Sequence, residues 1–414
     1  MKIIKRLLFL IVMAVVILLA GYEFGYREKS ENFFKEDIKQ VYINRDLKKH
    51  DYSMIEKYLR ETGREDLINN MKHTQNVLKG LYIFSYGRIE ENMEREIVVV
   101  DTGLAYPILR TKLTDYFTED GEYYLLKEER KPKELTGVDI YLKPYRGYFV
   151  LGVSKNLIEG FLGARKSSDS NLVTLDKDSR VGALGKVVMD LTGDKFFEGL
   201  GITGTVAGGD LNKDMLSIYN EFYGSGEFID SLKDQPEERR YTTYAGRDRI
   251  YISGNNIGGS VTMALRSMDS RELETLNMIF SMLGVKVEDV FNQIDGEAVM
   301  DMNSNSWMIP LKDTRAIKKI FKFFGQEGKV LYGDRELVLD GNLLKSGRVD
   351  EGTEKVKIAK EDFLYGDLSM DIFNSIFSDK ARGKLTGKTS EKGVVVELEL
   401  NAEATKDLFE ETLK

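Results

Sequence analysis

The sequence predicts an α+β protein: antiparallel sheets with helices packed on one face, arranged as two related units behind one transmembrane helix. Three observations lead to this fold class. Short β-branched and aromatic runs come in pairs around turn residues, as in antiparallel hairpins. Segments with a helical period separate these pairs, which is typical of α+β folds. One long uncharged apolar segment stands at the N-terminus.

The N-terminal segment predicts a membrane anchor over 1–26. Residues 7–22 (LLFLIVMAVVILLAGY) contain no charge. As a helix they span roughly 24 Å, and two isoleucines before them extend the run toward the roughly 30 Å of a bilayer core. The basic residues in front place the N-terminus in the cytoplasm and residues after about 26 outside it. We expect contact with the lipid bilayer through residues 3–24.

A cleaved signal peptide is the alternative, and it would make the protein secreted. Ala20 or Gly21 could precede the cut, but the leucines three residues from it are bulkier than cleavage favours. Tyr22 stands where a lipoprotein signal requires cysteine, which excludes lipidation. A buried core helix is a third reading, disfavoured because no other segment is as apolar. Both main readings make the bulk of the chain extracytoplasmic.

The first α+β unit is expected over 27–164. Its first residues, 27–40, are charged and predict a stalk or a first helix. Apolar spacing predicts a helix over 65–79, and Pro107 suits the first turn of a helix that runs to about 117. Strands are predicted at 40–44, 81–86, 97–101, 123–126, 138–142 and 148–153, followed by a helix at 156–162.

A polar segment, 165–181, predicts a linker or long loop before the second, larger unit over 182–414. In 394–400 (VVVELEL) the alternation predicts a half-buried strand. Helices are predicted from 254 through 265 and at 271–283, 313–324 and 402–413. The other predicted strands are 184–191, 202–207, 215–223, 251–253, 299–302, 307–309, 329–332, 336–339 and 384–387.

Two segments share one pattern. Residues 147–162 (GYFVLGVSKNLIEGFL) and a stretch within 246–265 (RDRIYISGNNIGGSVTMAL) both read as a strand, a turn with Ser and Asn, and a helix. A duplication explains this, and so do two ordinary strand–turn–helix units, because Asn and Gly suit turns. With the N-terminal segment, the pattern resembles bacterial envelope proteins with an anchor and duplicated α+β domains. The resemblance covers most of 37–414 and implies no catalytic residue.

Composition excludes several functions. The chain has no cysteine, so it has no disulfide, thiolate metal site or cysteine nucleophile. His50 and His73 are its two histidines, which excludes a multi-histidine metal site, and we expect both on the solvated surface. The net charge of −8 disfavours nucleic acid and general attraction to an anionic membrane. The sequence assigns no catalytic, cofactor-binding or metal-binding residue.

Three motifs resemble ligand loops. Gly199, Gly201 and Gly204 fit G-x-G-x-x-G, but a strand follows where the dinucleotide fingerprint needs a helix, which favours a turn. The segment from Gly383 to Thr389 is one residue short of a phosphate loop and reads as part of a hairpin. Residues 210–221 carry acidic residues at calcium-loop spacing, but a methionine replaces the required glycine, which favours strand–turn–strand.

The helix predicted at 313–324 combines a basic face with an apolar stripe, between Asp313 as N-cap and Gly325 after its end. We expect it to pack on a sheet with the basic face in solvent; a helix lying on a membrane surface is the alternative. Trp307 is expected to pack in a hairpin. The basic residues are Arg315, Lys318, Lys319 and Lys322, and the apolar ones Ile317, Ile320, Phe321 and Phe324.

These observations favour a non-enzymatic envelope module that binds another envelope protein. A carrier or sensor of an apolar envelope ligand is one alternative, and it predicts a deep apolar cavity. A hydrolase with an unrecognised carboxylate site is another, and it predicts clustered carboxylates or lysines with shifted pKa values in one cleft. Adjacent acidic residues such as Glu128-Glu129 and Glu361-Asp362 do not single out such a site among 68 carboxylates.

Overall fold

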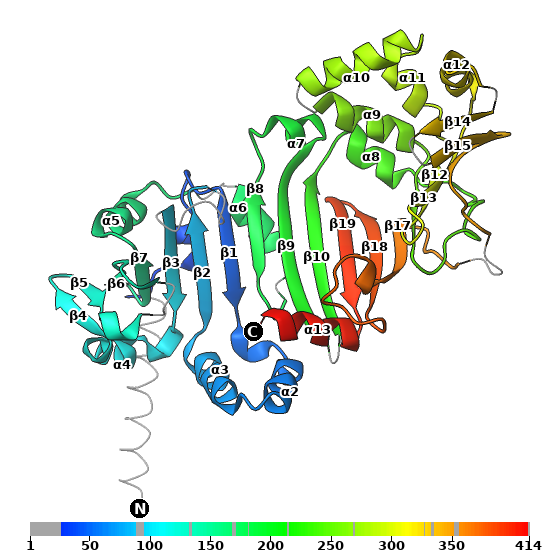
Figure 1. Cartoon of the computed structure of the whole chain (residues 1–414). Helices are drawn as coiled ribbons and strands as arrows, with labels where there is room; N and C mark the ends of the chain where they lie inside the picture. The colour runs from blue at the N-terminus through cyan, green and yellow to red at the C-terminus, as the bar shows by residue number, and fades with distance from the viewer. Residues whose placement is uncertain are drawn as a thin grey trace, which may run out of the picture. The chain divides into compact units, whose positions relative to one another are not determined.

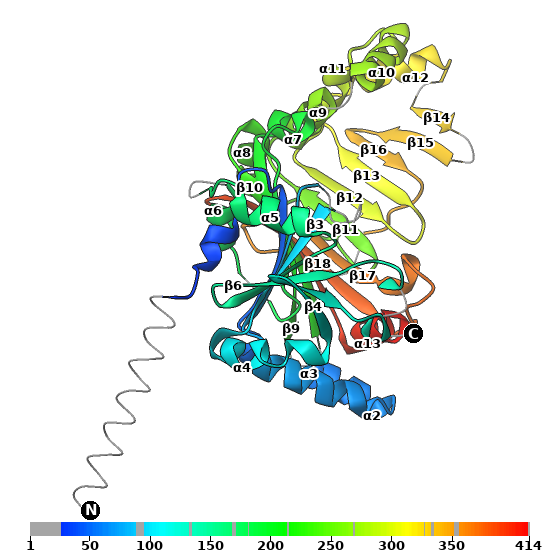
Figure 2. The same cartoon turned by 90° about the vertical axis from the view of Figure 1, so that its left-hand side faces the viewer.

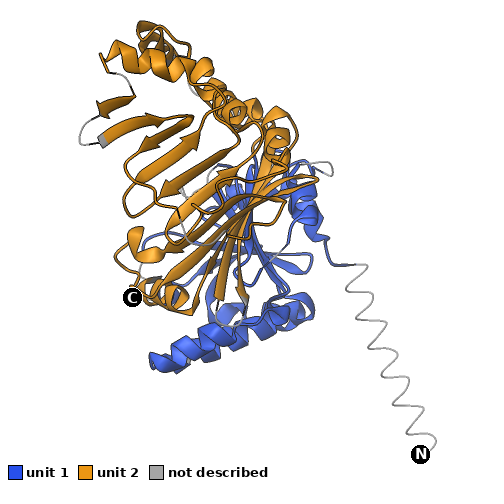
Figure 3. Cartoon of the chain, turned by 90° about the vertical axis from the view of Figure 1, so that its right-hand side faces the viewer, with its two compact units in different colours: residues 1–190 blue, residues 191–414 orange. Residues whose placement is uncertain are grey.

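The chain forms two compact units, residues 1–190 and 191–414, coloured separately in Figure 3. Both combine helices with antiparallel strands, which confirms the α+β class (Figure 1). The computed structural model describes residues 26–87, 95–131, 135–167, 171–180, 182–212, 215–267, 270–326, 328–332, 335–351 and 356–412. Among these residues no helix is long and apolar enough to cross a bilayer. The predicted anchor lies outside the described residues, apart from Tyr26.

Unit 1 is built on an antiparallel sheet. Val41 and Ile43 alternate with half-buried residues on β1 and pair with Phe84 and Tyr82 on β2, so one face forms the core. In spatial order the strands are β8 (Lys186–Asp190), β1 (Gln40–Arg45), β2 (Gly80–Ser85), β3 (Glu96–Asp101), β7 (Tyr148–Gly152), β6 (Tyr141–Tyr145), β5 (Tyr123–Leu126) and β4 (Phe117–Asp120).

Helices connect these strands. α2 (Ser53–Glu61) and α3 (Glu65–Val77) lie at one end of the unit 1 sheet in Figures 1 and 2. After β7, the Ser154 hydroxyl accepts a hydrogen bond from the Leu157 amide at 3.1 Å and caps α5 (Lys155–Gly163). These helices confirm the predictions at 65–79 and 156–162. The helix at Pro107 is shorter than predicted, since α4 (Tyr106–Arg110) ends before β4 begins.

Two polar segments of unit 1 are more ordered than the sequence predicts. Residues 27–40 form neither a stalk nor an α-helix: Phe33, Phe34 and Ile38 are buried in the core around a short 3₁₀ turn. The predicted linker at 165–181 contains α6 (Asn171–Asp178), which buries its leucines. The units divide after β8, which pairs with β1, so the boundary falls later than the predicted 182.

Unit 2 contains a larger antiparallel sheet. The strand predicted at 215–223 and the strand pairs predicted at 299–309, 329–339 and 384–400 are all present. In spatial order the strands are β9 (Ile202–Asn212), β10 (Met215–Gly224), β19 (Gly393–Leu400), β18 (Arg382–Ser390), β17 (Asp362–Ser369), β11 (Arg249–Ser253), β12 (Glu297–Asp301), β13 (Ser306–Pro310), β16 (Leu343–Ser346), β15 (Arg335–Asp340) and β14 (Lys329–Tyr332).

Most helices of unit 2 gather on one side of its sheet, whereas α13 (Ala402–Thr412) lies at the far end of β10, β18 and β19 (Figures 1 and 2). α9 contacts α7, α8 and α11, so these helices form a continuous group. The group consists of α7 (Lys195–Gly199), α8 (Glu227–Lys233), α9 (Ile257–Ser267), α10 (Ser270–Met282), α11 (Val287–Phe291) and α12 (Arg315–Phe323).

Candidate functional site

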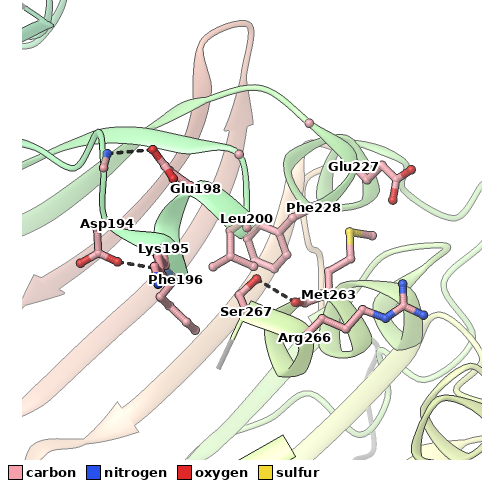
Figure 4. A pocket seen from close by; sticks show the side chains of 14 residues that line it. Asp194, Lys195, Phe196, Glu198, Leu200, Glu227, Phe228, Met263, Arg266 and Ser267 are labelled. Atoms are coloured by element: carbon pink, nitrogen blue, oxygen red, sulfur yellow. Dashed lines mark hydrogen bonds between the residues drawn. The ribbon is translucent and has the colours of Figure 1, made fainter. Parts of the chain in front are cut away.

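A pocket of about 1140 Å³ opens between α7, α8 and α9 of unit 2 (Figure 4). Its apolar part consists of Leu200, Phe228, Met263 and the 38% exposed Phe196. Charged side chains surround these residues: Asp194, Lys195, Glu198, Glu227 and Arg266. An apolar centre with a charged rim is the composition of a surface that binds another molecule from solvent.

Two carboxylates build the α7 side of the pocket. Asp194 Oδ1 accepts hydrogen bonds from the Phe196 amide at 3.0 Å and the Phe197 amide at 3.4 Å, so Asp194 is the N-cap of α7. Glu198 Oε1 accepts from the Gly193 amide at 2.9 Å and ties the preceding loop to the helix. A helix this short has little stability of its own, so these caps determine where its side chains stand.

Close packing explains the glycines of the pocket. A Cβ on Gly199 would lie 2.2 Å from the Ser267 Oγ of α9, and one on Gly201 would lie 2.1 Å from the Ser225 carbonyl oxygen. Gly201 also has a φ of +71°, which favours glycine. The turn that joins α7 to β9 therefore packs directly onto its neighbours. The predicted turn is confirmed, and the helix-then-strand order does not fit a dinucleotide site.

Several polar side chains of the pocket already have partners within unit 2. Ser267 is its one hydroxyl side chain, and Ser267 Oγ donates to the Met263 carbonyl oxygen at 3.0 Å within α9, not to a base. Asp194 and Glu198 are occupied in capping. Arg266 is 3.8 Å from Glu288, and its side chain stays 64% exposed. Among the described residues no three acidic or histidine side chains are grouped as metal ligands.

Unit 1 contains a second polar site, at the point where the described chain begins. The Arg27 guanidinium pairs with Asp101 of β3, and the two side chains are only 6% and 5% exposed. Asp101 Oδ1 also accepts from the Gly103 amide at 2.8 Å, and the Arg27 Cζ lies 4.9 Å from the centre of the Tyr148 ring. Burial raises the pKa of Asp101 above its ordinary value, although Arg27 opposes the shift. A pocket of about 640 Å³ is lined by both residues of this pair, and a second of about 450 Å³ is lined by the adjacent Thr102 and Gly103.

Buried Glu297 on β12 supports the backbone of unit 2. Its two carboxylate oxygens accept from the Arg240 amide at 2.7 Å and the Tyr241 amide at 2.8 Å. Burial raises the pKa of Glu297, and the same cause raises the pKa of Asp362 at the start of β17. Neither carboxylate lines the α7–α8–α9 pocket.

The residues singled out in the sequence lie in different places. His50 is half-buried, with Nε2 3.1 Å from the Arg45 carbonyl oxygen, whereas His73 is exposed on α3. Trp307 is half-buried in the β12–β13 hairpin, as predicted. Glu128 and Glu129 are in a short 3₁₀ turn.

The other two ligand-loop motifs lie in hairpins. Residues 383–389 lie inside strand β18. The calcium-like segment is a β9–β10 hairpin in which Asp210 pairs with Ser217, so the strand–turn–strand interpretation is confirmed. Of the three motifs, the G-x-G-x-x-G segment contributes residues to the α7–α8–α9 pocket, which Gly199 and Gly201 line.

Comparisons with known proteins leave the family open. No model of a known protein family matches this chain, and no curated protein matches it. A solved structure, crystal form I of TP0453, is similar over 49% of this chain and 82% of that one. The TM-score is 0.29 and the sequence identity 6%, a level of similarity from which we draw no argument.

Proposed function

We propose that this protein is a membrane-anchored, extracytoplasmic binding module of the cell envelope, and that it binds a protein partner in the α7–α8–α9 pocket. One observation carries the proposal: an open recess with an apolar centre and a rim of both charge signs, built on capped backbone. Protein interfaces share that arrangement of an apolar centre within a polar rim. Phe196 and Phe228 are the aromatic residues available to contact a partner.

The anchor part of the proposal is supported by the uncharged apolar segment 7–22, and the described chain begins shortly after it. Arg27 is already fixed against β3, and Glu28 Oε2 accepts from the Arg146 guanidinium at 3.0 Å. Unit 1 therefore begins without a free stalk after residue 26. A bilayer anchor over residues 3–24 would hold this unit close to the membrane surface, where envelope complexes form.

The proposal also includes an ancestral duplication of the two units. Its support is that β7–α5 and β11–α9, the two segments with similar sequence, are each a strand followed directly by a helix. Both strands are internal to their sheets: β7 pairs with β3 and β6, and β11 with β12 and β17.

Site-specific photo-crosslinking in the native membrane tests the proposed function. A photoreactive residue at Phe196 lines the pocket, and the matched control is the same residue at Phe373, which is 50% exposed and outside the pocket. We expect one adduct of defined protein mass at Phe196 and none at Phe373. The substitution Arg266→Glu, which reverses a rim charge, should reduce that adduct at least fivefold.

Native mass spectrometry of the full-length protein completes the test. A protein-sized added mass would support the proposal. A lipid-sized added mass would favour a carrier of an apolar ligand, and a bare chain with equal crosslinking at both positions would contradict partner binding in the pocket. The same spectrum shows whether residues 1–21 are retained, which distinguishes an anchor from a cleaved signal.

A further inference from the structure

Helix α12 has one face fixed in the core and another free in solvent. Ala316, Ile317 and Phe321 are buried against a cluster that includes Leu311 and Val330. This packing confirms the sheet-packed helix that the sequence predicts. Asp313 accepts from the Arg315 amide at 2.9 Å, but the N-cap is Thr314, one residue after the predicted N-cap, and the helix spans Arg315–Phe323 where the sequence predicts 313–324. Gly325 follows the helix with a φ of +72°, as expected for its end.

Large apolar side chains are exposed where α12 ends. Phe323 and Phe324 are 58% and 54% exposed, and their rings meet edge to face at 5.5 Å. Leu331 on β14 is 67% exposed too, but strand alternation turns it away from the face on which Val330 packs with α12, so it does not belong to the same surface. Burying a side chain of this size contributes about 2 kcal/mol, so two adjacent exposed rings at the end of α12 indicate a surface that is covered in use.

A neighbouring helix also exposes large apolar side chains. Helix α10 exposes Met278, Ile279 and Met282 by 60%, 46% and 69%. α11 contacts both α10 and α12, and Figures 1 and 2 show these three helices together at one end of unit 2.

The same end of α12 is basic. Lys318, Lys319 and Lys322 are exposed, and within the described residues they form no salt bridge. Arg315, by contrast, pairs with Asp313, and Lys329 pairs with Glu336 at 2.9 Å. Among the described residues, three positive charges without an ion-pair partner thus accompany the exposed rings in a chain whose net charge is −8. Charges farther away than about 8 Å are largely screened at physiological salt, so the local sign decides what this surface attracts.

We propose that this end of unit 2 docks on an anionic phospholipid surface. Phe323 and Phe324 enter the headgroup region, and the three lysines contact lipid phosphates. Residue types favour lipid over an acidic protein: lysine is depleted from protein interfaces, which prefer arginine, whereas aromatic rings and lysines together are typical of membrane-surface helices. The contact is additional to any anchor and independent of what occupies the α7–α8–α9 pocket.

The absence of cysteine allows a direct test in the full chain. Phe324→Cys carries an environment-sensitive fluorophore, and the control is Phe373→Cys, whose native side chain is 50% exposed. The full-length protein is held in neutral phosphatidylcholine nanodiscs. Vesicles of phosphatidylcholine with 30% phosphatidylglycerol, or of phosphatidylcholine alone, are then added.

We expect a blue shift and quenching by lipid-borne quenchers at position 324 with the anionic vesicles only, and no change at position 373. Replacing Lys318, Lys319 and Lys322 together by glutamine should weaken vesicle binding about 100-fold, since each lysine near an anionic surface contributes about tenfold or less. All substituted side chains are exposed, so folding is preserved.

Three results would overturn the proposal. One is no response of the probe at position 324 to either vesicle. The second is an equal response at positions 324 and 373, and the third is undiminished binding by the triple glutamine variant. Protection of position 324 by an acidic envelope protein, without a response to vesicles, would assign the surface to a protein partner instead.

Discussion

Removal of Arg27 should destabilise unit 1 selectively. The Arg27→Met substitution keeps much of the side-chain volume but leaves Asp101 as a buried carboxylate at 5% exposure without its cation. Breaking one partner of a buried pair costs about 3 kcal/mol or more. A surface pair is the matched control: Arg165 lies 3.3 Å from Glu36 with 84% of its side chain exposed, so Arg165→Met should cost about 0.5 kcal/mol or less.

Hydrogen exchange measured by mass spectrometry can resolve this difference by unit. The single tryptophan, Trp307, lies in unit 2 and does not report on unit 1. A loss of about 3 kcal/mol speeds exchange of the β2 and β3 amides roughly 150-fold, when exchange follows global opening of the unit. Peptides of unit 2 should exchange as before. Equal exchange of β3 in Arg27→Met and Arg165→Met would refute the reasoning.

The destabilisation caused by Arg27→Met should depend on pH, and the direction of that dependence can be predicted. Burial raises the folded-state pKa of Asp101, so its contribution to stability is greatest below the ordinary carboxyl pKa and is lost as pH rises through the raised value. Without Arg27 that pKa rises further, because the guanidinium is the main group that lowers it. The loss caused by Arg27→Met should therefore be smaller at pH 5 than at pH 8. The double variant with Asp101→Asn should recover much of the loss at pH 8.

Three other predictions concern unit 2. Gly201→Ala should lower the free energy of unfolding by about 3 kcal/mol more than Gly193→Ala, as measured by Trp307 fluorescence in denaturant. Both residues have positive φ (+71° and +90°), but only an alanine at 201 would place its Cβ 2.1 Å from a carbonyl oxygen. Equal losses of stability would contradict the close packing inferred for Gly201. Asp194→Ala should cost about 1 kcal/mol and speed amide exchange at the start of α7, and unchanged exchange there would exclude the capping role. Glu297 has a raised folded pKa, so wild-type stability should fall as pH rises through that value, whereas Glu297→Gln should show a flatter profile in the same fluorescence assay; parallel profiles would mean that another group causes the dependence.

A periodic pattern of apolar residues in the sequence predicts those helices and strands in which buried and exposed residues alternate regularly. On β1 and β3 the buried residues alternate strictly, so residues 40–44 and 97–101 could be recognised as strands. Segments 27–40 and 165–181 are rich in charge, and their burial depends on partners far away in the sequence. Lys186, for example, is buried because its ammonium group meets Asp176 of α6 at 2.8 Å, a pair that no local pattern reveals. Tertiary contacts therefore decide the structure of both segments.

The pocket, too, could not be predicted from local sequence patterns, except for two of its glycines. Its residues come from segments 193–201, 226–228 and 263–267, which only the folded chain brings together. The sequence nevertheless draws attention to Gly199 and Gly201, through a motif that resembles a dinucleotide fingerprint and that we interpret as a turn. Closely spaced glycines indicate a place where either another backbone segment or a ligand comes very near the chain. The order of helix and strand around the glycines distinguishes these two cases. Here the close neighbours are Ser267 and Ser225, so the glycines allow α7 to pack against α9 and the end of β10 without blocking the space between them. A larger residue at either position would push these elements apart, and this is why the motif lies at the pocket although its order of helix and strand does not fit a dinucleotide site.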